Sequence, residues 1–249
     1  MIWGLALVNV ALASDALLHS FAGDVGGAMP TTDLIINADG TMLYGMTRDG
    51  GIGDHGTIFK ITTAGGVFEV IHNFVSSYGQ VPIGGLILGD DGYLYGTLAE
   101  GGDGEFGTIF RIATNAEVPS TIEILHSFSG YNSTAADADG AHPNGNLILS
   151  GDYLYGMTSI GGTCSDCTDD GDPEGCGTIF RIHKVNVTDY AILHHFTDET
   201  NDGSRPEGSL TLDGTTLYGM TTGGGDSYNG TIFKIAKDAT PASLSLIHI

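Results

Sequence analysis

The stretch Leu43-Tyr44-Gly45-Met46-Thr47, followed after a short loop by Gly56-Thr57-Ile58-Phe59-Lys60-Ile61, decides the fold. The same pair of motifs returns three times, at residues 94–112, 154–182 and 217–235. A pattern that recurs in this way is typical of a chain built from similar structural units. The sequence therefore predicts a repeat protein before any single motif is interpreted.

Two further elements recur between these motifs. An apolar run follows each of four prolines, Pro30, Pro82, Pro143 and Pro206. A second run ends on a histidine and, in four of its five copies, a nearby phenylalanine; its histidines, His19, His72, His126, His194 and His248, are spaced by 53, 54, 68 and 54 residues. Turn residues such as Asp39-Gly40 separate these apolar runs, which is a strong hairpin signal. Each unit therefore holds four short strands.

Four antiparallel strands in each unit of about fifty residues predict an all-β fold, a β-propeller built from four-stranded blades. The expected units cover residues 22–74, 75–128, 129–196 and 197–249. Residues 17–21 add an extra copy of the fourth strand, so five copies of that strand accompany four copies of the others. This surplus indicates that the chain is a fragment of a larger propeller or an incomplete ring. The alternative is a compact four-bladed ring with a displaced N-terminal strand.

The charge of the chain restricts its partners. Thirty acidic residues oppose eight basic ones, for a net charge of −22. Nucleic acids and anionic membranes attract basic surfaces, so both are excluded as expected partners. The apolar segment 1–13 ends in Ala11-Leu12-Ala13, which favours a signal peptide, although a buried first strand is the alternative. No transmembrane segment is expected, and the protein is predicted to be secreted or displayed at the cell surface.

The repeats resemble the Gloeobacter–Verrucomicrobia type (GloVer) tandem repeat of bacterial proteins predicted to be extracellular. The resemblance rests on Leu43–Ile61, Leu94–Ile112, Leu154–Ile182 and Leu217–Ile235, and on the turns Gly140-Ala141-His142-Pro143 and Gly203-Ser204-Arg205-Pro206. The blade layout is also similar to that of kelch propellers. The resemblance implies a secreted or surface-anchored, propeller-like protein, and it implies no catalytic residues.

Residues that occupy the same place in every unit are expected to be structural. This set contains the histidines His19, His72, His126 and His194, the basic residues Lys60, Arg111, Arg181 and Lys234, and the tyrosines Tyr44, Tyr95, Tyr155 and Tyr218. The basic residues are expected to pair with a carboxylate of a neighbouring blade or loop. The alternatives are a metal site formed by the histidines and an anion site formed by the basic residues.

The loops that follow each Leu-Tyr-Gly motif differ in every unit, and loops on a rigid scaffold carry most binding sites. The residues 48–55, 99–106, 159–176 and 222–229 form these loops. The ligand candidates in and near them are Arg48, His55, Glu100, Asp103, His142, Arg205 and Asp226. In the third loop, Asp169, Asp170, Asp172 and Glu174 are candidate calcium ligands, although the spacing is not that of an EF-hand. A solvated acidic loop is the alternative.

The three cysteines Cys164, Cys167 and Cys176 all fall in this third loop. In an oxidising compartment, a disulfide between Cys176 and either Cys164 or Cys167 would close the loop. A Cys164–Cys167 bridge and a zinc site that adds Asp166 or a histidine are the alternatives.

These observations favour a non-catalytic extracellular propeller that recognises a polysaccharide or a protein partner through its variable acidic loops. One alternative is an enzyme, a lyase or hydrolase with a cation-assisted site on one rim. The other is a structural component of a surface or filament, with further repeats or self-association. An enzyme requires unrepeated polar residues that converge on one point, whereas five of the nine histidines and four of the eight basic residues here occupy repeated positions.

Overall fold

A computed structural model describes residues 16–115, 120–130, 138–163, 168–169, 172–173, 176–199, 201–239 and 245–247. The regular elements in these ranges are all β-strands. No helix in the described part of the chain is long and apolar enough to cross a membrane.

Nearly all of the described strands form four sheets, which we call blades 1 to 4, and the four main strands of each blade pair in chain order. Blade 1 contains β1 (Ile35–Ile36), β2 (Met42–Thr47), β3 (Thr57–Thr62) and β4 (Phe68–Asn73). Blade 2 contains β5 (Ile87–Leu88), β6 (Tyr93–Leu98), β7 (Thr108–Ala113) and β8 (Glu123–Ser127). Blade 3 contains β9 (Ala141–Pro143), β10 (Ile148–Ser150), β11 (Tyr153–Ile160), β14 (Thr178–His183) and β15 (Tyr190–His195). Blade 4 contains β16 (Gly203–Asp213), β17 (Thr216–Gly224), β18 (Thr231–Ala236) and β19 (Ser245–Ile247).

Two details distinguish the third blade from a plain four-stranded sheet. The short strand β9 pairs with the far end of β11, beyond the point where β10 stops. In addition, β12 (Thr168–Asp169) and β13 (Asp172–Pro173) form a small hairpin inside the third variable loop, which the sequence did not predict.

The two repeated motifs form the central hairpin of each blade. In blade 1, Tyr44 lies opposite Lys60 and Met46 lies opposite Ile58. The pairing of β3 with β4 then shifts by one residue between Ile58 and Phe59, and the same shift recurs in blades 2 and 3. A bulge of this kind increases the local twist of a sheet. The predicted hairpin is therefore present, and the fourth strand lies at one edge of each blade.

Both faces of the central strands are apolar because each blade packs against the next. Tyr44, Met46 and Ile58 of blade 1 form one buried cluster with Leu86 and Phe110 of blade 2. The clusters between blades 2 and 3 and between blades 3 and 4 use the equivalent residues. Burial of this apolar surface is the main stabilising contribution to the stack.

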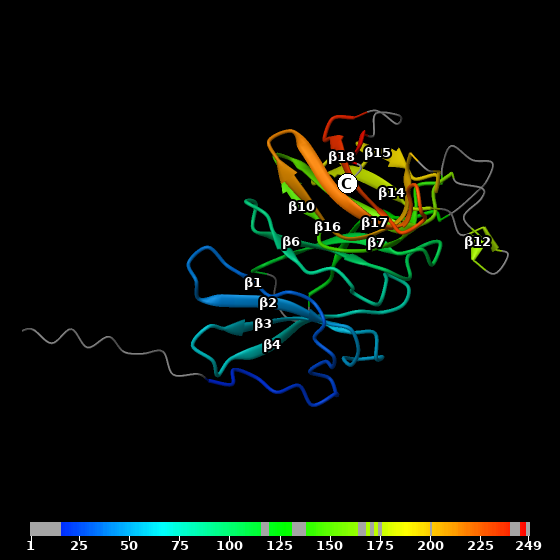
Figure 1. Cartoon of the computed structure of the whole chain (residues 1–249). Coiled ribbons are helices and arrows are strands. Elements are labelled where there is room, and N and C mark those ends of the chain that lie inside the picture. Colours follow the sequence, from blue (N-terminus) through cyan, green and yellow to red (C-terminus); the bar gives the residue numbers. More distant parts are fainter. Residues whose placement is uncertain are drawn as a thin grey trace, which may run out of the picture.

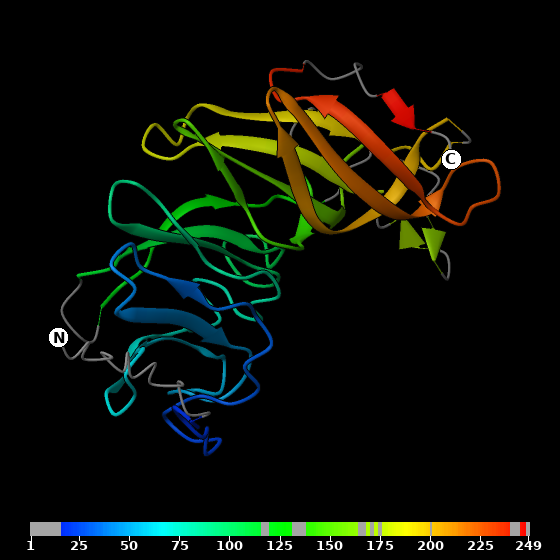
Figure 2. The same cartoon turned by 60° about the vertical axis from the view of Figure 1, so that its left-hand side comes forward.

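The four blades form an arc, with blade 1 and blade 4 at its opposite ends (Figures 1 and 2). Residues 17–21, expected to form an extra fourth strand, are not assigned as a strand and pair with no sheet. They pack instead on blade 1, where the Phe21 ring lies 5.2 Å from that of Phe59 and the His19 ring stacks at 3.7 Å on Phe68. The prediction of a strand was therefore wrong for this segment, because no neighbouring strand is available to accept its backbone hydrogen bonds.

Asn146 connects all four blades at one point. Its side-chain oxygen accepts a hydrogen bond from the Gly85 backbone at 2.6 Å, and its side-chain nitrogen donates to Asp33 at 3.2 Å. Its backbone N–H donates to the Ser209 hydroxyl at 2.9 Å. Each of these residues immediately precedes the apolar run of its own blade, so the first strands converge here.

Candidate functional site on the loop face

One side of the arc carries the variable loops together with the segments that lead into each first strand; we call it the loop face. The opposite side, the turn face, carries the short turns. Hydroxyl pairs at the end of the central hairpin support the loops. The Thr47 and Thr57 hydroxyls lie 2.9 Å apart, and Thr158 and Thr178 repeat the pair at 2.8 Å. Gly27 lies over the first pair with a φ of +95°, and a Cβ there would fall 2.5 Å from the Thr47 hydroxyl.

The residue before each repeated proline has an unusual backbone conformation. These pre-proline residues are Met29, Val81, His142 and Arg205, and their φ angles lie between 52° and 60°. A residue other than glycine in this left-handed region costs about 1–3 kcal/mol and persists only where the surroundings impose it. The four positions therefore share one strained backbone while carrying four different side chains.

Neighbouring strands and loops hold the pre-proline residues in place. The Met29 and Val81 carbonyls accept hydrogen bonds from the next loop at 3.0 Å, whereas the Ser159 hydroxyl donates to the His142 carbonyl at 3.1 Å. The His142 N–H also donates to the Phe106 carbonyl of the preceding blade at 2.9 Å. The strain is thus imposed partly by blade-to-blade contact, and the side chains are presented at fixed positions.

The predicted ligand candidates are distributed around this face and do not converge. His142 and Arg205 occupy equivalent pre-proline positions in blades 3 and 4. Arg48 is exposed in blade 1 and lies 3.9 Å from Asp49, while Glu100 in blade 2 accepts a hydrogen bond from Gln80 at 2.9 Å. The remaining three, His55, Asp103 and Asp226, lie in the loops of blades 1, 2 and 4, and both aspartates are exposed.

In blades 2 and 3, the repeated histidine connects the fourth strand to the segment that follows it. His126 Nε2 lies 2.6 Å from Asp139, which also accepts hydrogen bonds from the backbone and hydroxyl of Ser129. His194 Nε2 lies 3.1 Å from both carboxylate oxygens of Asp202. The carboxylate stands between the serine and the histidine, so this group lacks the order that would activate a serine nucleophile.

The linker before blade 2 departs from this pattern. Tyr78 occupies the place that Asp139 and Asp202 occupy in the linkers before blades 3 and 4, since each residue directly precedes the glycine of the Gly-x-x-Pro element. His72 therefore has no carboxylate partner. Its Nδ1 bonds to the Ser120 carbonyl at 2.7 Å, and its buried Nε2 has no hydrogen-bond partner. Burial lowers the pKa of His72.

A hollow of about 510 Å³ lies beside Tyr78 on blade 2. Its lining includes Tyr78, Asp103 and residues 124–127 of β8, among them His126. Tyr78 is 52% exposed, so the ring is available to a ligand. The volume falls in the range usual for small-molecule sites. This hollow combines an aromatic ring, a carboxylate and an imidazole. It lies at the linker before blade 2, where Tyr78 stands in place of the aspartate found in the linkers before blades 3 and 4.

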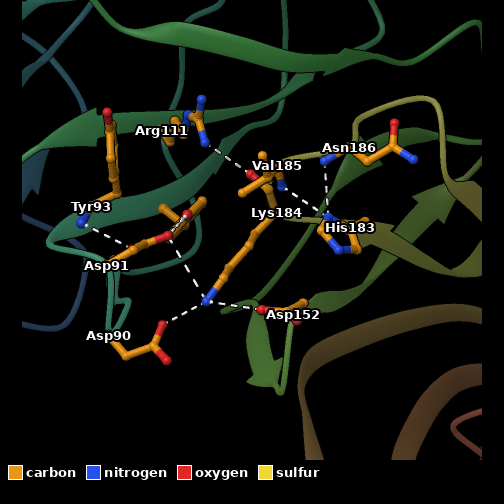
Figure 3. Close-up of polar contacts among 10 residues, drawn as sticks. Asp90, Asp91, Tyr93, Arg111, Asp152, His183, Lys184, Val185 and Asn186 are labelled. Atoms are coloured by element: carbon orange, nitrogen blue, oxygen red, sulfur yellow. Dashed lines mark hydrogen bonds and ion pairs between the residues drawn. The ribbon is translucent and has the colours of Figure 1, made fainter.

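The turn face holds a different polar cluster, which braces blade 2 against blade 3 (Figure 3). The Lys184 side chain is only 7% exposed, and its Nζ lies 2.6 Å from Asp90 and 3.4 Å from Asp152. The hydrogen bond from Lys184 lowers the pKa of Asp90. Arg111 donates to the Lys184 carbonyl at 3.0 Å. This brace was not predicted, because Lys184 lies two residues beyond the Gly-Thr-Ile-Phe-Arg-Ile motif.

Three of the four repeated basic residues pair with acids, but only one of them pairs with a neighbouring blade as predicted. Lys60 pairs with Glu69 at 3.0 Å and Arg111 with Glu123 at 2.8 Å, both within one blade. Arg181 reaches Asp238 of the next blade at 3.5 Å. Lys234 is exposed. The first three therefore join neighbouring strands or blades and leave no ring of free positive charge.

The predicted metal and cysteine chemistry lies mostly outside the described residues. Asp170, Glu174, Cys164 and Cys167 are not described, nor are the side chains of Asp169 and Asp172. Within the described ranges, no group of three or more His, Cys, Asp or Glu is placed to hold a metal. Cys176 is buried and disulfide-bonded, and its pairing with Cys164 or Cys167 remains a prediction.

A model of the Gloeobacter/Verrucomicrobia repeat matches residues 6–168, about two thirds of the chain. The chain belongs to this repeat family. No curated protein matches it significantly.

Among solved structures, the chain is similar to one described as TolB from Agrobacterium tumefaciens, with 11% identity and a TM-score of 0.50 over 87% of this chain and 61% of the other. It is also similar to one described as a 6-phosphogluconolactonase from Bacteroides uniformis, with 14% identity and a TM-score of 0.49 over 89% of this chain and 57% of the other. The chain thus spans about three fifths of the structures that it matches, and the likeness to the TolB structure establishes the β-propeller fold alone.

Three residues that organise these surfaces were missed by the sequence analysis: Tyr78, Asn146 and Lys184. Tyr78 had a detectable signal, because it stands where the linkers of blades 3 and 4 both have an aspartate. The position of Asn146 holds a different residue in every unit, so a comparison of the units does not mark it.

Proposed function

We propose that this protein is a binding module that recognises an extracellular polysaccharide on its loop face, with the hollow beside Tyr78 as the first binding position. The observation that carries the proposal is the break in the repeat at Tyr78. Where two other linkers place a carboxylate, this linker presents an exposed aromatic ring beside Asp103 and His126.

The chemistry of the hollow suits a sugar ring. The apolar face of a pyranose packs on an aromatic side chain, and its hydroxyls donate to a carboxylate such as Asp103 or bond to an imidazole such as His126. The net charge of −22 opposes an anionic polymer. We therefore expect a neutral polysaccharide as the ligand.

The pre-proline residues extend this site around the face. They lie on the loop side of successive blades and present different side chains from one backbone geometry. A long polymer that lies across the arc would contact several of them, so each contributes a part of the specificity. Such a distributed site favours binding over catalysis, because catalysis needs reacting groups that converge on one point.

The test is affinity electrophoresis against a panel of neutral polysaccharides, followed by calorimetry on any that retards the protein. We expect Tyr78→Ala and Asp103→Ala each to weaken binding by about tenfold or more, which corresponds to about 1.4 kcal/mol. Matched controls exist in blade 4. Tyr228→Ala removes an exposed aromatic ring from its loop, and Asp226→Ala removes the aspartate at the position equivalent to Asp103.

If Tyr228→Ala and Asp226→Ala weakened binding as strongly as Tyr78→Ala and Asp103→Ala do, the ligand would not bind specifically at the hollow. That result would contradict the proposed site. Binding to no neutral polysaccharide would contradict the ligand class. If a bound polysaccharide is cleaved, reducing ends or unsaturated products are released. Their detection would show that the protein is an enzyme and not a non-catalytic binding module.

A further inference from the structure

One peptide group in the turn between β14 and β15 connects blade 3 to blade 2. Its carbonyl oxygen, which belongs to Lys184, accepts a hydrogen bond from the Arg111 guanidinium of blade 2 at 3.0 Å. Its N–H, which belongs to Val185, donates to Nδ1 of His183 at 3.1 Å. Figure 3 shows both contacts. Because a peptide group is planar, His183 fixes the direction in which the carbonyl points toward Arg111.

The same imidazole nitrogen accepts a second backbone hydrogen bond, from the Asn186 N–H at 2.9 Å. A nitrogen that accepts hydrogen bonds carries no proton, so His183 is neutral in this arrangement and its proton lies on Nε2. Histidine is the side chain whose charge ordinarily changes between pH 5 and pH 8. Protonation of Nδ1 would place an N–H against two backbone N–H groups, and both of these donors would lose their acceptor.

The histidine at this position is peculiar to blade 3. In each blade, the equivalent residue pairs with the first residue of the second strand, and these equivalents of His183 are Thr62, Ala113 and Ala236. Threonine and alanine have no group that titrates near neutral pH. The turn that follows β14 is therefore the one of these four turns in which a titratable side chain occupies this position.

The charged groups around this turn are engaged elsewhere. They are Arg111, Arg181, Lys184, Asp90, Asp91, Asp152 and Asp189. Asp189 accepts a hydrogen bond from the Tyr153 hydroxyl, and Arg181 lies 4.9 Å from the centre of the Tyr153 ring. The edge of that ring meets His183 at 5.2 Å. Among the described residues, the carboxylates that pair with a histidine pair with His126 and His194, so none is placed to hold a protonated His183.

We propose that His183 is a proton-sensitive latch between blades 2 and 3. At neutral pH, Nδ1 of His183 holds the peptide between Lys184 and Val185 with its carbonyl toward Arg111. Protonation of His183 removes this acceptor, the peptide turns, and the carbonyl leaves Arg111. The core between the two blades is apolar and does not change charge over this range, so the latch opens locally while the blades stay stacked. This device lies on the turn face and does not rest on the proposed ligand.

The experiment is NMR spectroscopy of the isotope-labelled full chain at pH 7.5 and at pH 5. At pH 7.5 we expect the imidazole nitrogen shifts of His183 to show a proton on Nε2 and none on Nδ1. The amide protection factors of Val185 and Asn186, corrected for the intrinsic exchange rate at each pH, should fall at least about tenfold at pH 5, because each N–H loses its acceptor. The amide of Phe180, in the middle of β14, should stay protected.

Two substitutions separate the acceptor from its titration. His183→Asn supplies a carboxamide oxygen that cannot titrate near neutral pH, so it should keep both amides protected at both pH values. His183→Ala supplies no acceptor and should lose this protection at both. The control His55→Asn removes a loop histidine and should behave like the wild type.

Protection of Val185 and Asn186 that does not change with pH in the wild type would overturn the proposal. So would an equal fall in His183→Asn. Loss of protection at Phe180 in the wild type at pH 5 would also overturn it, because it would show that the blades separate as a whole.

Discussion

The contacts between blades and the loop face use the same repeat in opposite ways. Between blades, the repeat supplies the same side chains each time, and Phe110, Phe180 and Phe233 occupy equivalent buried places. On the loop face, the repeat supplies the same backbone each time and changes the side chain, as at His142 and Arg205. The difference teaches that stability resides in what recurs, whereas the capacity to recognise a ligand resides in what varies.

The largest expected effect comes from the contacts between blades. Phe180→Ala removes a fully buried ring that touches Phe128 of the preceding blade. We expect a loss of about 3–5 kcal/mol in the free energy of unfolding, because the cavity cannot collapse between two sheets. Urea unfolding measures it. Val185→Ala, at an exposed site, should change stability by less than about 0.5 kcal/mol. If both variants lost a similar free energy of unfolding, the contacts between blades would not be a special source of stability.

The second effect tests the close approach of the blades with a matched pair of glycines. Gly145→Ala and Gly208→Ala both place a Cβ at positive φ, at +87° and +77°. Only Gly145→Ala also drives the Cβ into a neighbouring carbonyl oxygen. We expect it to cost about 1–3 kcal/mol more than Gly208→Ala in urea unfolding. Equal losses would show that the inner ends do not approach as closely as described.

The third effect concerns the linkers, which join the two regions. Asp202→Ala leaves His194, Thr197 and the Gly203 N–H without their shared acceptor. Unsatisfied buried donors of this kind should cost about 1–3 kcal/mol in the free energy of unfolding. The exposed Asp226→Ala is the control and should be close to neutral. A neutral Asp202→Ala would mean that water replaces the carboxylate.

The fourth effect is the pH dependence of the free energy of unfolding that His72 causes. His72 precedes the linker in which Tyr78 stands in place of an aspartate. Because burial lowers the pKa of His72 in the folded state, the unfolded chain binds more protons in the window between the folded and unfolded values. The stability that neutral His72 contributes is present above the unfolded value of about 6.5 and falls as the pH drops below it. We expect His72→Asn to flatten the fall in urea midpoint between pH 7 and pH 5. His55→Asn, on a loop, should leave that fall unchanged, and an unaltered slope in His72→Asn would contradict the assignment.

The smallest expected effect comes from the loop face itself. His142→Ala and Arg205→Ala keep the strained backbone and remove only the side chain beyond Cβ. We expect each to change the free energy of unfolding by less than about 0.5 kcal/mol in urea titration, as is usual for changes away from the core. A loss comparable to that of Phe180→Ala would show that these side chains support the fold and are not held ready for a ligand.

The sequence by itself determined the blade. The alternation of turn residues with short β-rich runs fixes four antiparallel strands, and apolar residues on both faces of Leu-Tyr-Gly and Gly-Thr-Ile-Phe require a neighbour on each side. These are local properties, because residues close together in the sequence determine where a strand turns and which of its side chains are apolar. That is why the hairpins of all four units appear where they were predicted.

Only the tertiary structure decided which residues from different units meet. Asn146 bonds to three other blades, and Lys184 braces two turns that are far from it in the chain. It also decided that residues 17–21 pair with no sheet. Such contacts depend on how one blade stacks on the next. The residue pattern within a single unit does not determine the position of the neighbouring blade, so it does not predict these contacts.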